Sequence, residues 1–291
     1  MKKPRTSLRT NPLPNDILNI KRFALRECGL NLPDEKTYLI VQRLEALVKA
    51  TGCSSYGEFY TLLSNDSAGM LRDQVISALT THETEFFRDQ HPFDIFRDHL
   101  LPEASRIVSD LEGHDPGQVQ FLSVGVSTGQ EAYSIAMIIA DFVLKNRFRG
   151  VDPRRFHILG IDVSQDVIKQ ANQGRYSEEE IRRGLPVPMR DRFFEPHDGF
   201  WEAKPELKGL VAFMKANLLS GYLPLKSFKV VFCRNLLIYF DGPTRKAALE
   251  RLHQIAEPGG ILFLGASETI LETAPLFESV RFEKALAYRA L

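Results

Sequence analysis

Hydrophobic residues recur every three or four positions through the first third of the chain, which is the spacing of one face of a helix. Ser55 and Glu58 have the spacing of a capping box at a helix N-terminus. We therefore expect a flexible, proline-containing arm over residues 1–14 and a helical domain over residues 15–100. The predicted helices lie near residues 17–29, 38–52, 55–63 and 71–79, with another from residue 92.

Short apolar runs alternate with helical patterns from residue 119 onward. Such alternation predicts an α/β domain over residues 119–291, in which a doubly wound, mostly parallel sheet carries helices on both faces. Residues 101–118 are rich in Pro, Gly, Asp and Glu and are expected to be a linker. The irregular stretch 174–209 predicts a small inserted subdomain at about residues 186–209. The predicted strands are residues 119–124, 156–161, 210–214, 229–233 and 261–264, with a closing hairpin over 280–288.

The composition fits a globular protein of one or two domains. The 291 residues are 44% hydrophobic, and 37 Lys and Arg balance 37 Asp and Glu, so the formal net charge is zero. A general nucleic-acid-binding protein usually carries a basic excess, so no nucleic-acid partner is expected. Residues 1–60 nevertheless hold ten Lys and Arg against six Asp and Glu, which predicts a mildly basic face for an acidic partner.

Three sequence features predict a cytoplasmic protein. Cys28, Cys53 and Cys233 are odd in number and widely spaced, which fits neither a disulfide framework nor a zinc site. Residues 1–10 are basic, but no apolar segment follows them, as it would in a secretory signal. The longest apolar stretch, residues 135–144, contains Asp141 and is too short to span a bilayer.

Residues 119–143 combine a predicted strand, a glycine-containing turn and the start of a helix. Gly125 and Gly129 let the backbone approach a ligand closely, and a helix N-terminus offers free N–H groups. The next predicted strand ends at Asp162, where a carboxylate can accept hydrogen bonds from both hydroxyls of a ribose. This combination is typical of a nucleotide-binding site.

Three chemistries compete for this stretch. A dinucleotide site lacks its G-x-G-x-x-G pattern, because Ser127 replaces the second glycine. A serine hydrolase would use Ser127 in a G-x-S-x-G match, but it also needs a late histidine on a loop, and His253 falls in a helical pattern. An S-adenosylmethionine site would use Glu131 to meet the positively charged methionine part. The pattern leaves all three open and favours the third.

Four polar residues follow closely on the ends of predicted strands, or on the turn after one. They are Glu131, Asp162, Asn217 and Asn235. Parallel sheets bind ligands beyond the carboxyl ends of their strands. We therefore expect these side chains to gather at one edge of the sheet, where they would form a single site.

Five motifs along the chain belong together: residues 80–88 (TTHETEFFR), 123–136 (SVGVSTGQEAYSIA), 160–171, 233–241 (CRNLLIYFD) and 265–268. In this combination they resemble the CheR-type chemotaxis receptor methyltransferases. The likeness extends in order over about residues 15–290 and implies a class I S-adenosylmethionine methyltransferase fold, Rossmann-like, with an N-terminal all-helical domain and a small inserted β-subdomain.

The resemblance implies methyl transfer from S-adenosylmethionine to glutamate side chains of chemoreceptors, which gives glutamate methyl esters and S-adenosylhomocysteine. Arg88 and Tyr239 would orient the incoming carboxylate and are the candidate catalytic residues. A glutamate with a pKa of about 4.3 is already ionised at neutral pH, so neither a general base nor a metal is expected. By motif position, the implied cofactor contacts are His82, Thr84, Arg88, Glu131, Asp162, Asn217, Leu218, Arg234 and Asn235.

The chain departs from the family pattern at four positions. His82 stands where relatives often have asparagine, which keeps a hydrogen-bond donor but makes the contact pH-sensitive. Gln130 replaces the first of two common acids, so Glu131 must carry the charge. Ala266 replaces a frequent histidine, and Ser164 replaces a second acid after the second strand. None of the four removes a residue that the transfer requires.

The implied partners are the helical, acidic cytoplasmic domains of methyl-accepting chemoreceptors, without membrane insertion. Relatives that grip a pentapeptide tether at the receptor C-terminus carry an elongated glycine-rich loop, whereas residues 195–199 here hold one glycine and a proline. We therefore expect no dependence on a tether, and direct docking through basic helices near Arg22, Arg26, Arg43 and Lys49. The alternatives are a non-catalytic S-adenosylmethionine-binding regulator and a serine hydrolase that uses Ser127.

Overall fold

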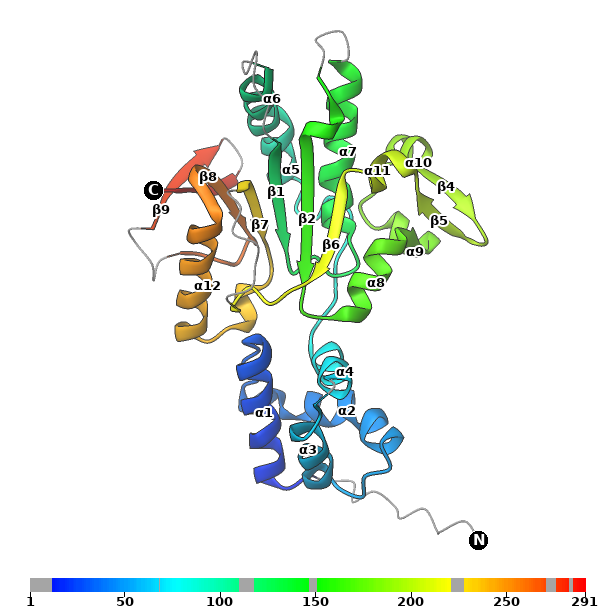
Figure 1. Cartoon of the computed structure of the whole chain (residues 1–291), viewed down its shortest axis with the longest axis vertical. Coiled ribbons are helices and arrows are strands. Elements are labelled where there is room, and N and C mark those ends of the chain that lie inside the picture. Colours follow the sequence, from blue (N-terminus) through cyan, green and yellow to red (C-terminus); the bar gives the residue numbers. More distant parts are fainter. Residues whose placement is uncertain are drawn as a thin grey trace. The chain divides into compact units, whose positions relative to one another are not determined.

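The computed structural model describes residues 12–67, 69–109, 118–146, 151–220, 228–270, 276–282 and 285–291. Contacts divide the chain into two compact units, both of which are drawn in Figure 1. The first unit runs to Thr81 and includes residues 163–165 and 239–244. The second unit contains the rest of the chain from His82.

The first unit is helical, as its hydrophobic spacing predicts. Its helices bury one apolar face each, and residues such as Ile20, Leu44 and Phe59 are fully enclosed. Ser55 accepts a hydrogen bond from Glu58 N at 3.2 Å, but the Glu58 carboxylate bonds Ser54 and not Ser55, so only half of the predicted capping box forms. The helices are α1 (Pro14–Cys28), the 3₁₀ turn η1 (Asp34–Lys36), α2 (Thr37–Ala50), α3 (Tyr56–Ser64) and α4 (Met70–Leu79).

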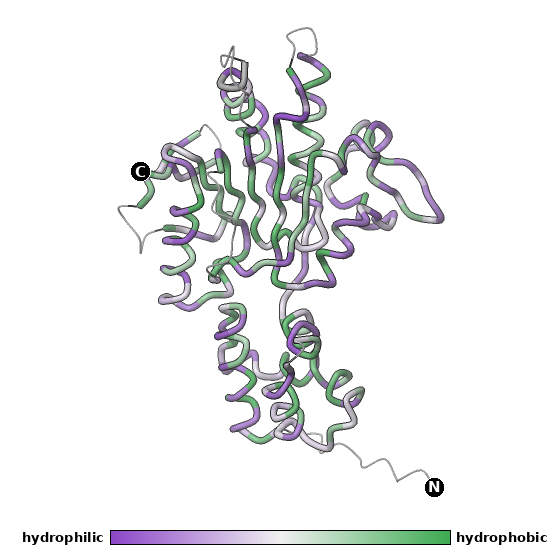
Figure 2. The backbone as a smooth tube through the Cα atoms, in the orientation of Figure 1, coloured by the Kyte–Doolittle hydropathy of each residue, from purple (hydrophilic) through white to green (hydrophobic). Residues whose placement is uncertain are grey.

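The second unit is built on a seven-stranded sheet with the order β6-β2-β1-β7-β8-β10-β9. The first five strands of that order are parallel, and β10 and β9 close the sheet as an antiparallel hairpin, as predicted. Figure 2 shows hydrophobic residues along the central strands. The strands are β1 (Val119–Val124), β2 (Phe156–Asp162), β6 (Val211–Lys215), β7 (Phe228–Cys233), β8 (Ala256–Leu264), β9 (Phe277–Phe282) and β10 (Ala285–Ala290).

Helices cover both faces of this sheet (Figure 1). Side chains of alternate strand residues, such as Phe121, Val230 and Phe232, pack with α5 and α7 in one core. The opposite face is covered by α12. The helices wholly within this unit are α5 (His91–Ile95), the π-helical turn η2 (Phe96–Leu100), α6 (Leu101–Ser109), α7 (Gln130–Lys145) and the 3₁₀ turn η4 (Pro153–Arg155). Three more, α8 (Gln165–Gln173), the 3₁₀ turn η5 (Leu237–Tyr239) and α12 (Gly242–Ile255), each include one to three residues of the first unit.

The structure differs from the sequence prediction over residues 82–109. The sequence predicts one helical domain over residues 15–100, but Phe86, Phe93 and Phe96 are buried in the core of the α/β unit, so the division falls at Thr81. The predicted linker starts at residue 101, yet α6 continues the helix there, because Leu101 and Ala104 bury the same face. Pro102 lacks an N–H, and the chain accommodates it just after the π-helical turn η2.

A second, three-stranded sheet with the order β3-β5-β4 interrupts the α/β unit. It begins at Arg175, whereas the sequence predicts a subdomain only from about residue 186. The two residues of β3 are too few to give a readable alternation. Its elements are β3 (Arg175–Tyr176), α9 (Glu178–Arg182), α10 (Val187–Phe193), β4 (Phe194–His197), β5 (Phe200–Ala203) and α11 (Pro205–Lys208).

Two predicted features lie partly beyond the described ranges: residues 1–11 of the arm and residues 110–117 of the linker. Of the arm, only residues 12–14 are described, and α1 already begins at Pro14. Among the helices that the structure describes, none is both long enough and apolar enough to cross a membrane.

Candidate functional site at the carboxyl ends of the strands

The turn between β1 and α7 forms the centre of the candidate site. Gly125 N and Val126 N donate to Ile161 O at 2.9 and 3.0 Å, which binds the turn to the end of β2. Gly129 has a φ of 100° and lies so close to Tyr176 that a Cβ would stand 3.0 Å from the tyrosine oxygen. Only glycine fits such a position without strain. The turn therefore presents backbone, and no side chain, at Gly129 where α7 begins.

Asp162 fixes the same turn from the neighbouring strand. It is 8% exposed, and its Oδ2 accepts a hydrogen bond from Ser127 N at 3.0 Å. Ser127 itself has a φ of 52°, a conformation that costs free energy in any residue with a side chain. The carboxylate thus holds a strained turn at the edge where a ribose is expected.

Arg234, at the end of β7, is the charged centre of the site. Its side chain is 2% exposed, and its Nη1 donates to Glu131 Oε2 at 3.0 Å. Its Nη2 donates to Asp89 Oδ2 and to Arg88 O, both at 2.7 Å. Ser123 Oγ donates to the other Glu131 oxygen at 2.7 Å. Both terminal nitrogens of the Arg234 guanidinium are thus bound within the protein.

The segment from His82 to Gln90 is bound to this edge at three points. Ser127 Oγ donates to His82 O at 2.7 Å, Phe87 N donates to Ser134 Oγ at 3.0 Å, and Arg234 holds Arg88 O. Phe87, Asp89 and Gln90 all have positive φ values, between 41° and 60°. The described chain has six non-glycine residues with positive φ, and five of them lie at this edge: these three together with Ser127 and Asn235. Backbone strain of this kind clusters at functional sites.

Arg88 differs from Arg234 in how its side chain is used. It is half-buried, and its Nη1 donates to Glu83 O at 3.3 Å. Within the described residues it forms no ion pair with Asp89 or Glu85, because Asp89 pairs with Arg234. A guanidinium held by one weak bond is able to accept an anionic ligand.

The remaining predicted contacts follow β6 and β7. Ala216 N donates to Asp162 O at 2.9 Å, so the first residue after β6 lies beside the last residue of β2. Asn217 Oδ1 accepts from Leu219 N at 2.9 Å, and Leu218 is buried. Asn235 follows Arg234 with a φ of 58°.

All nine predicted cofactor residues thus belong to the α/β unit, in segments that reach the carboxyl edge of its sheet. Thr84, one of the nine, lies in the segment 82–90 that is hydrogen-bonded to this edge. Tyr239 groups instead with the helical unit. Its carbonyl accepts from Asn31 N at 2.8 Å, and its side chain packs against the helical core. The sequence pattern did not identify Ser123, Asp89 or Ser134. Ser123 could have been noticed as a lone hydroxyl in an apolar strand.

The hydrolase hypothesis fails on the geometry of Ser127. Its hydroxyl donates to a backbone carbonyl at 2.7 Å, whereas a serine nucleophile must give its proton to a base. Ser127 is also only 5% exposed, so a substrate has little access to its hydroxyl. Among the described residues, no group of three or more His, Cys, Asp and Glu is arranged to hold a metal.

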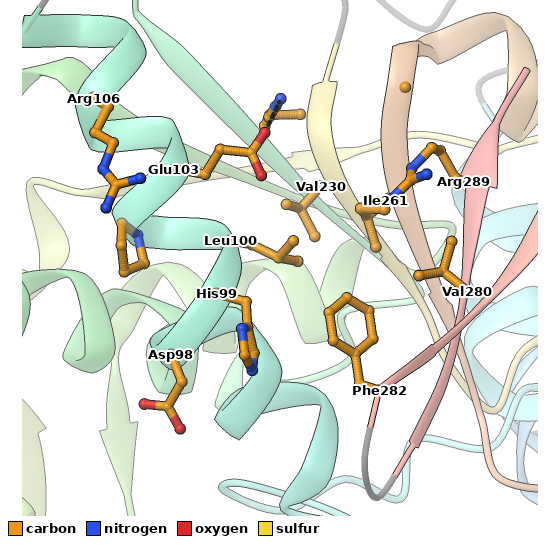
Figure 3. A pocket seen from close by; sticks show the side chains of 13 residues that line it. Asp98, His99, Leu100, Glu103, Arg106, Val230, Ile261, Val280, Phe282 and Arg289 are labelled. Carbon is orange, nitrogen blue, oxygen red and sulfur yellow. Dashed lines mark ion pairs between the residues drawn. The ribbon is translucent and has the colours of Figure 1, made fainter.

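A separate pocket of about 480 Å³ lies toward the other edge of the sheet, among the first residues of β7 and the middle of β8. Figure 3 shows the rings of His99 and Phe282 side by side in its lining, with centroids 5.4 Å apart. Two of its cations are already paired: Lys229 with Glu103 and Glu257, and Arg289 with Glu278. It is distinct from the site built around Asp162 and Glu131.

The residues at the carboxyl edge fit a nucleotide bearing an amino-acid part. The glycine turn offers close backbone approach, and Asp162 and Glu131 place two carboxylates, which are hydrogen-bond acceptors, at the same edge. Two family models match this chain: the CheR methyltransferase all-alpha domain over residues 15–80 and the CheR methyltransferase SAM-binding domain over residues 82–286. The chain belongs to the CheR methyltransferase family. It is therefore an S-adenosylmethionine-binding methyltransferase by family.

Curated CheR relatives match nearly the whole chain. Chemotaxis protein methyltransferase Cher2 of Pseudomonas putida is 36% identical over 277 residues, covering 94% of this chain and 98% of that protein. Chemotaxis protein methyltransferase 1 of Pseudomonas aeruginosa is 34% identical, with 92% and 95% covered. The chemotaxis protein methyltransferase of Escherichia coli is 31% identical, with 86% and 82% covered.

Proposed function

We propose that this protein transfers the methyl group of S-adenosylmethionine to glutamate side chains of chemoreceptors in chemosensory adaptation. The observation that carries the proposal is the single edge that joins Glu131, Asp162 and Arg88, within a chain of the CheR family. A cytoplasmic location follows from this substrate. The product on the receptor is a glutamate methyl ester.

The cofactor would supply a sulfonium-bound methyl group, whose transfer to a carboxylate oxygen leaves S-adenosylhomocysteine and an ester. Within the protein, Asp162 would accept from the ribose hydroxyls, and Glu131 would accept from the ammonium group. The rest of the cofactor site would be lined by the backbone of Asn217, Leu218, Arg234 and Asn235, together with His82 and Thr84. No proton has to move, because the receptor carboxylate is already ionised.

Arg88 and Tyr239 are proposed to act on the receptor glutamate. Arg88 is half-buried, and within the described residues its guanidinium is held only by Glu83 O, so it can attract and orient a carboxylate. The Tyr239 hydroxyl would donate to the same carboxylate and align one oxygen for attack. Catalysis is then mainly positioning of an existing nucleophile.

Receptor docking is proposed to be direct. In the small sheet, His197 pairs with Phe200, so Asp198 and Gly199 form a two-residue turn with φ values of 47° and 79°. This tight turn leaves no elongated loop for gripping a tether. Calorimetry with a receptor C-terminal pentapeptide should show no micromolar binding, and such binding would overturn tether independence.

The basic helices are proposed to meet an acidic receptor helix. Arg22 is exposed on α1 without an ion pair in the described chain, beside Arg26, which is 64% exposed. Arg43 has a different use, because it donates to Leu79 O and Thr80 O inside the helical unit. Arg22→Glu should reduce receptor methylation but leave S-adenosylmethionine binding unchanged, while Arg154→Glu, on the exposed turn η4, should change neither.

The test of the main proposal is transfer of tritium from methyl-labelled S-adenosylmethionine to membranes that carry the cognate receptors. Label should appear on the receptor and should be released as methanol by base, as for an ester. A non-catalytic regulator would bind S-adenosylmethionine by calorimetry without labelling any receptor. Base-stable label would indicate another acceptor and would contradict the glutamate ester.

A further inference from the structure

The Gly265–Glu268 motif follows β8, and its carboxylate joins two neighbouring loops of the site. Glu268 Oε2 accepts from Gly265 N at 2.7 Å and from Asn235 N at 2.8 Å. Its Oε1 accepts from Ile238 N at 3.1 Å. One side chain thus receives three backbone hydrogen bonds, two of them from residues 235–238, which follow β7.

The geometry around Glu268 is tight enough to fix these loops. Asn235 has a φ of 58°, so its conformation needs support from its surroundings. A Cβ at Gly265 would stand 2.8 Å from Glu268 Oε2 and 2.9 Å from Asn235 N, so only glycine allows the two loops to approach this closely. Hydrogen bonds to a charged acceptor are stronger than neutral ones.

We propose that Glu268 is a positioning residue of the methyl-transfer site, which sets the loop 235–238 through its backbone. This rests on the proposed function, in which Asn235 contacts the cofactor and Tyr239, the next residue after Ile238, meets the acceptor. Glu268 itself is assigned no contact with cofactor or receptor. Its removal would let Asn235 relax from its positive φ and would release the residue that precedes Tyr239.

Glu268→Gln tests this, because it keeps the length of the side chain but replaces one acceptor oxygen by an NH₂ group that opposes a backbone N–H. Glu180→Gln is the matched control. Glu180 is also a half-buried carboxylate that accepts a backbone N–H, from Ser177 at 2.8 Å, but it caps α9 in the small sheet region. Each variant disturbs the hydrogen bonds between one carboxylate and the backbone, but only Glu268 lies at the proposed site.

Cofactor affinity by calorimetry, kcat on receptor and thermal unfolding should be measured for both variants. We expect Glu268→Gln to lower S-adenosylmethionine affinity and kcat each by about tenfold or more, with Glu180→Gln within about twofold of wild type. If Glu268→Gln also stays within twofold, or if Glu180→Gln loses as much activity, the proposal is wrong. A wild-type protein that binds the cofactor without methylating receptors would contradict the proposed function instead.

Amide hydrogen exchange of the wild-type protein provides a test that needs no folded variant. If Glu268 holds the loops, the amides of Asn235, Ile238 and Gly265 should exchange much more slowly than that of an exposed residue such as Ala266. Exchange of Asn235 and Ile238 at the rate of Ala266 would show that the carboxylate does not hold them, and would overturn the proposal.

Discussion

Arg234 and Glu131, 103 positions apart in the chain, form a nearly solvent-free ion pair with an Nη1–Oε2 distance of 3.0 Å. The Arg234 side chain is 2% exposed, and the Glu131 side chain is 13% exposed. Two charges so far from water are stable only because each also has other partners, Asp89 for the arginine and Ser123 for the glutamate. The pair therefore sets where the Glu131 carboxylate lies at the carboxyl edge of the sheet.

Removing Arg234 should destabilise the fold. Arg234→Met leaves Glu131 charged and poorly solvated, which should cost about 3–5 kcal/mol of unfolding free energy. Arg289→Met is the control, because Arg289 and Glu278 are both about half exposed and such pairs contribute about 1 kcal/mol or less. Urea denaturation of both variants measures the difference. Equal losses of unfolding free energy would show that burial of the Arg234–Glu131 pair does not add to the cost of removing the arginine.

The sequence predicts the strands of the parallel sheet well, because continuous apolar runs such as residues 230–233 are buried on both faces. It also predicts Asp162 at the end of β2, where the structure has it. The hydrophobic pattern does not give the strands of the small sheet, since β4 is four residues long, contains Pro196 and is mostly exposed. The family resemblance implies a small inserted β-subdomain, and the structure confirms it.

Long-range polar contacts explain most of what the sequence could not predict. Asp89 lies next to Arg88 in the chain, yet it pairs with Arg234, 145 positions away. Neither composition nor spacing encodes such a pairing. The grouping of Tyr239 with the helical unit is similar, because its bond with Asn31 depends on the tertiary fold. The prediction that Tyr239 acts in transfer stays a prediction.

Tyr176 should matter for cofactor binding beyond its share of stability. Its ring is fully buried against Phe86, and its hydroxyl donates to Thr128 O in the glycine turn at 2.9 Å. Tyr133 is equally buried, but its hydroxyl donates to Ala171 O in α8 at 3.1 Å. Each Tyr→Phe variant should lose about 1–3 kcal/mol of the free energy of unfolding, because one buried hydrogen bond is removed. Calorimetry should show an affinity loss of about three- to tenfold for Tyr176→Phe only; equal affinities would assign Tyr176 a purely structural role.

Cys233 should make stability fall at high pH. Burial raises the pKa of its thiol well above the usual 9.0, and the carboxylates of Glu268 and Glu131 raise it further. As pH rises, the Cys233 thiol therefore ionises in the unfolded chain before it ionises in the folded protein. The contribution of the buried thiol to the free energy of unfolding is complete below about pH 9 and is lost as pH rises above that value. The stability advantage of wild type over Cys233→Ala should shrink by up to about 1.4 kcal/mol per pH unit. A constant difference between pH 8 and pH 10.5 would contradict the raised pKa.

Asp162→Ala should weaken the cofactor site in two ways. It removes the proposed ribose acceptor, and it releases Ser127 N from its 3.0 Å hydrogen bond. Loss of a charged acceptor costs about 1.5–3 kcal/mol, which is on the order of tenfold or more in S-adenosylmethionine affinity. Circular dichroism should confirm that the fold is retained. Unchanged affinity by calorimetry would remove Asp162 from the cofactor site.

Arg88 and Tyr239 test the transfer step itself. Phe86 and Phe87 are buried on the chain just before Arg88, which fixes the direction in which the arginine leaves the core. Tyr239→Phe removes one hydroxyl and keeps the ring that packs on the helical core, so folding and cofactor affinity should survive while turnover falls. Arg88→Ala should reduce turnover further and should also weaken cofactor binding. Losses of about ten- to a thousandfold fit the removal of one or two orienting hydrogen bonds.

The measurement is initial methylation rate at saturating S-adenosylmethionine, with receptor concentration varied. Because both residues are proposed to act on the bound acceptor, the fall should appear in kcat and not only in the receptor KM. Arg97→Ala is a suitable control, since Arg97 is an exposed arginine paired with Asp94 and Asp98. If Arg88→Ala and Tyr239→Phe both methylate receptors at the wild-type rate, the two residues are structural. Alignment of the carboxylate would then depend on other groups at the carboxyl edge of the sheet.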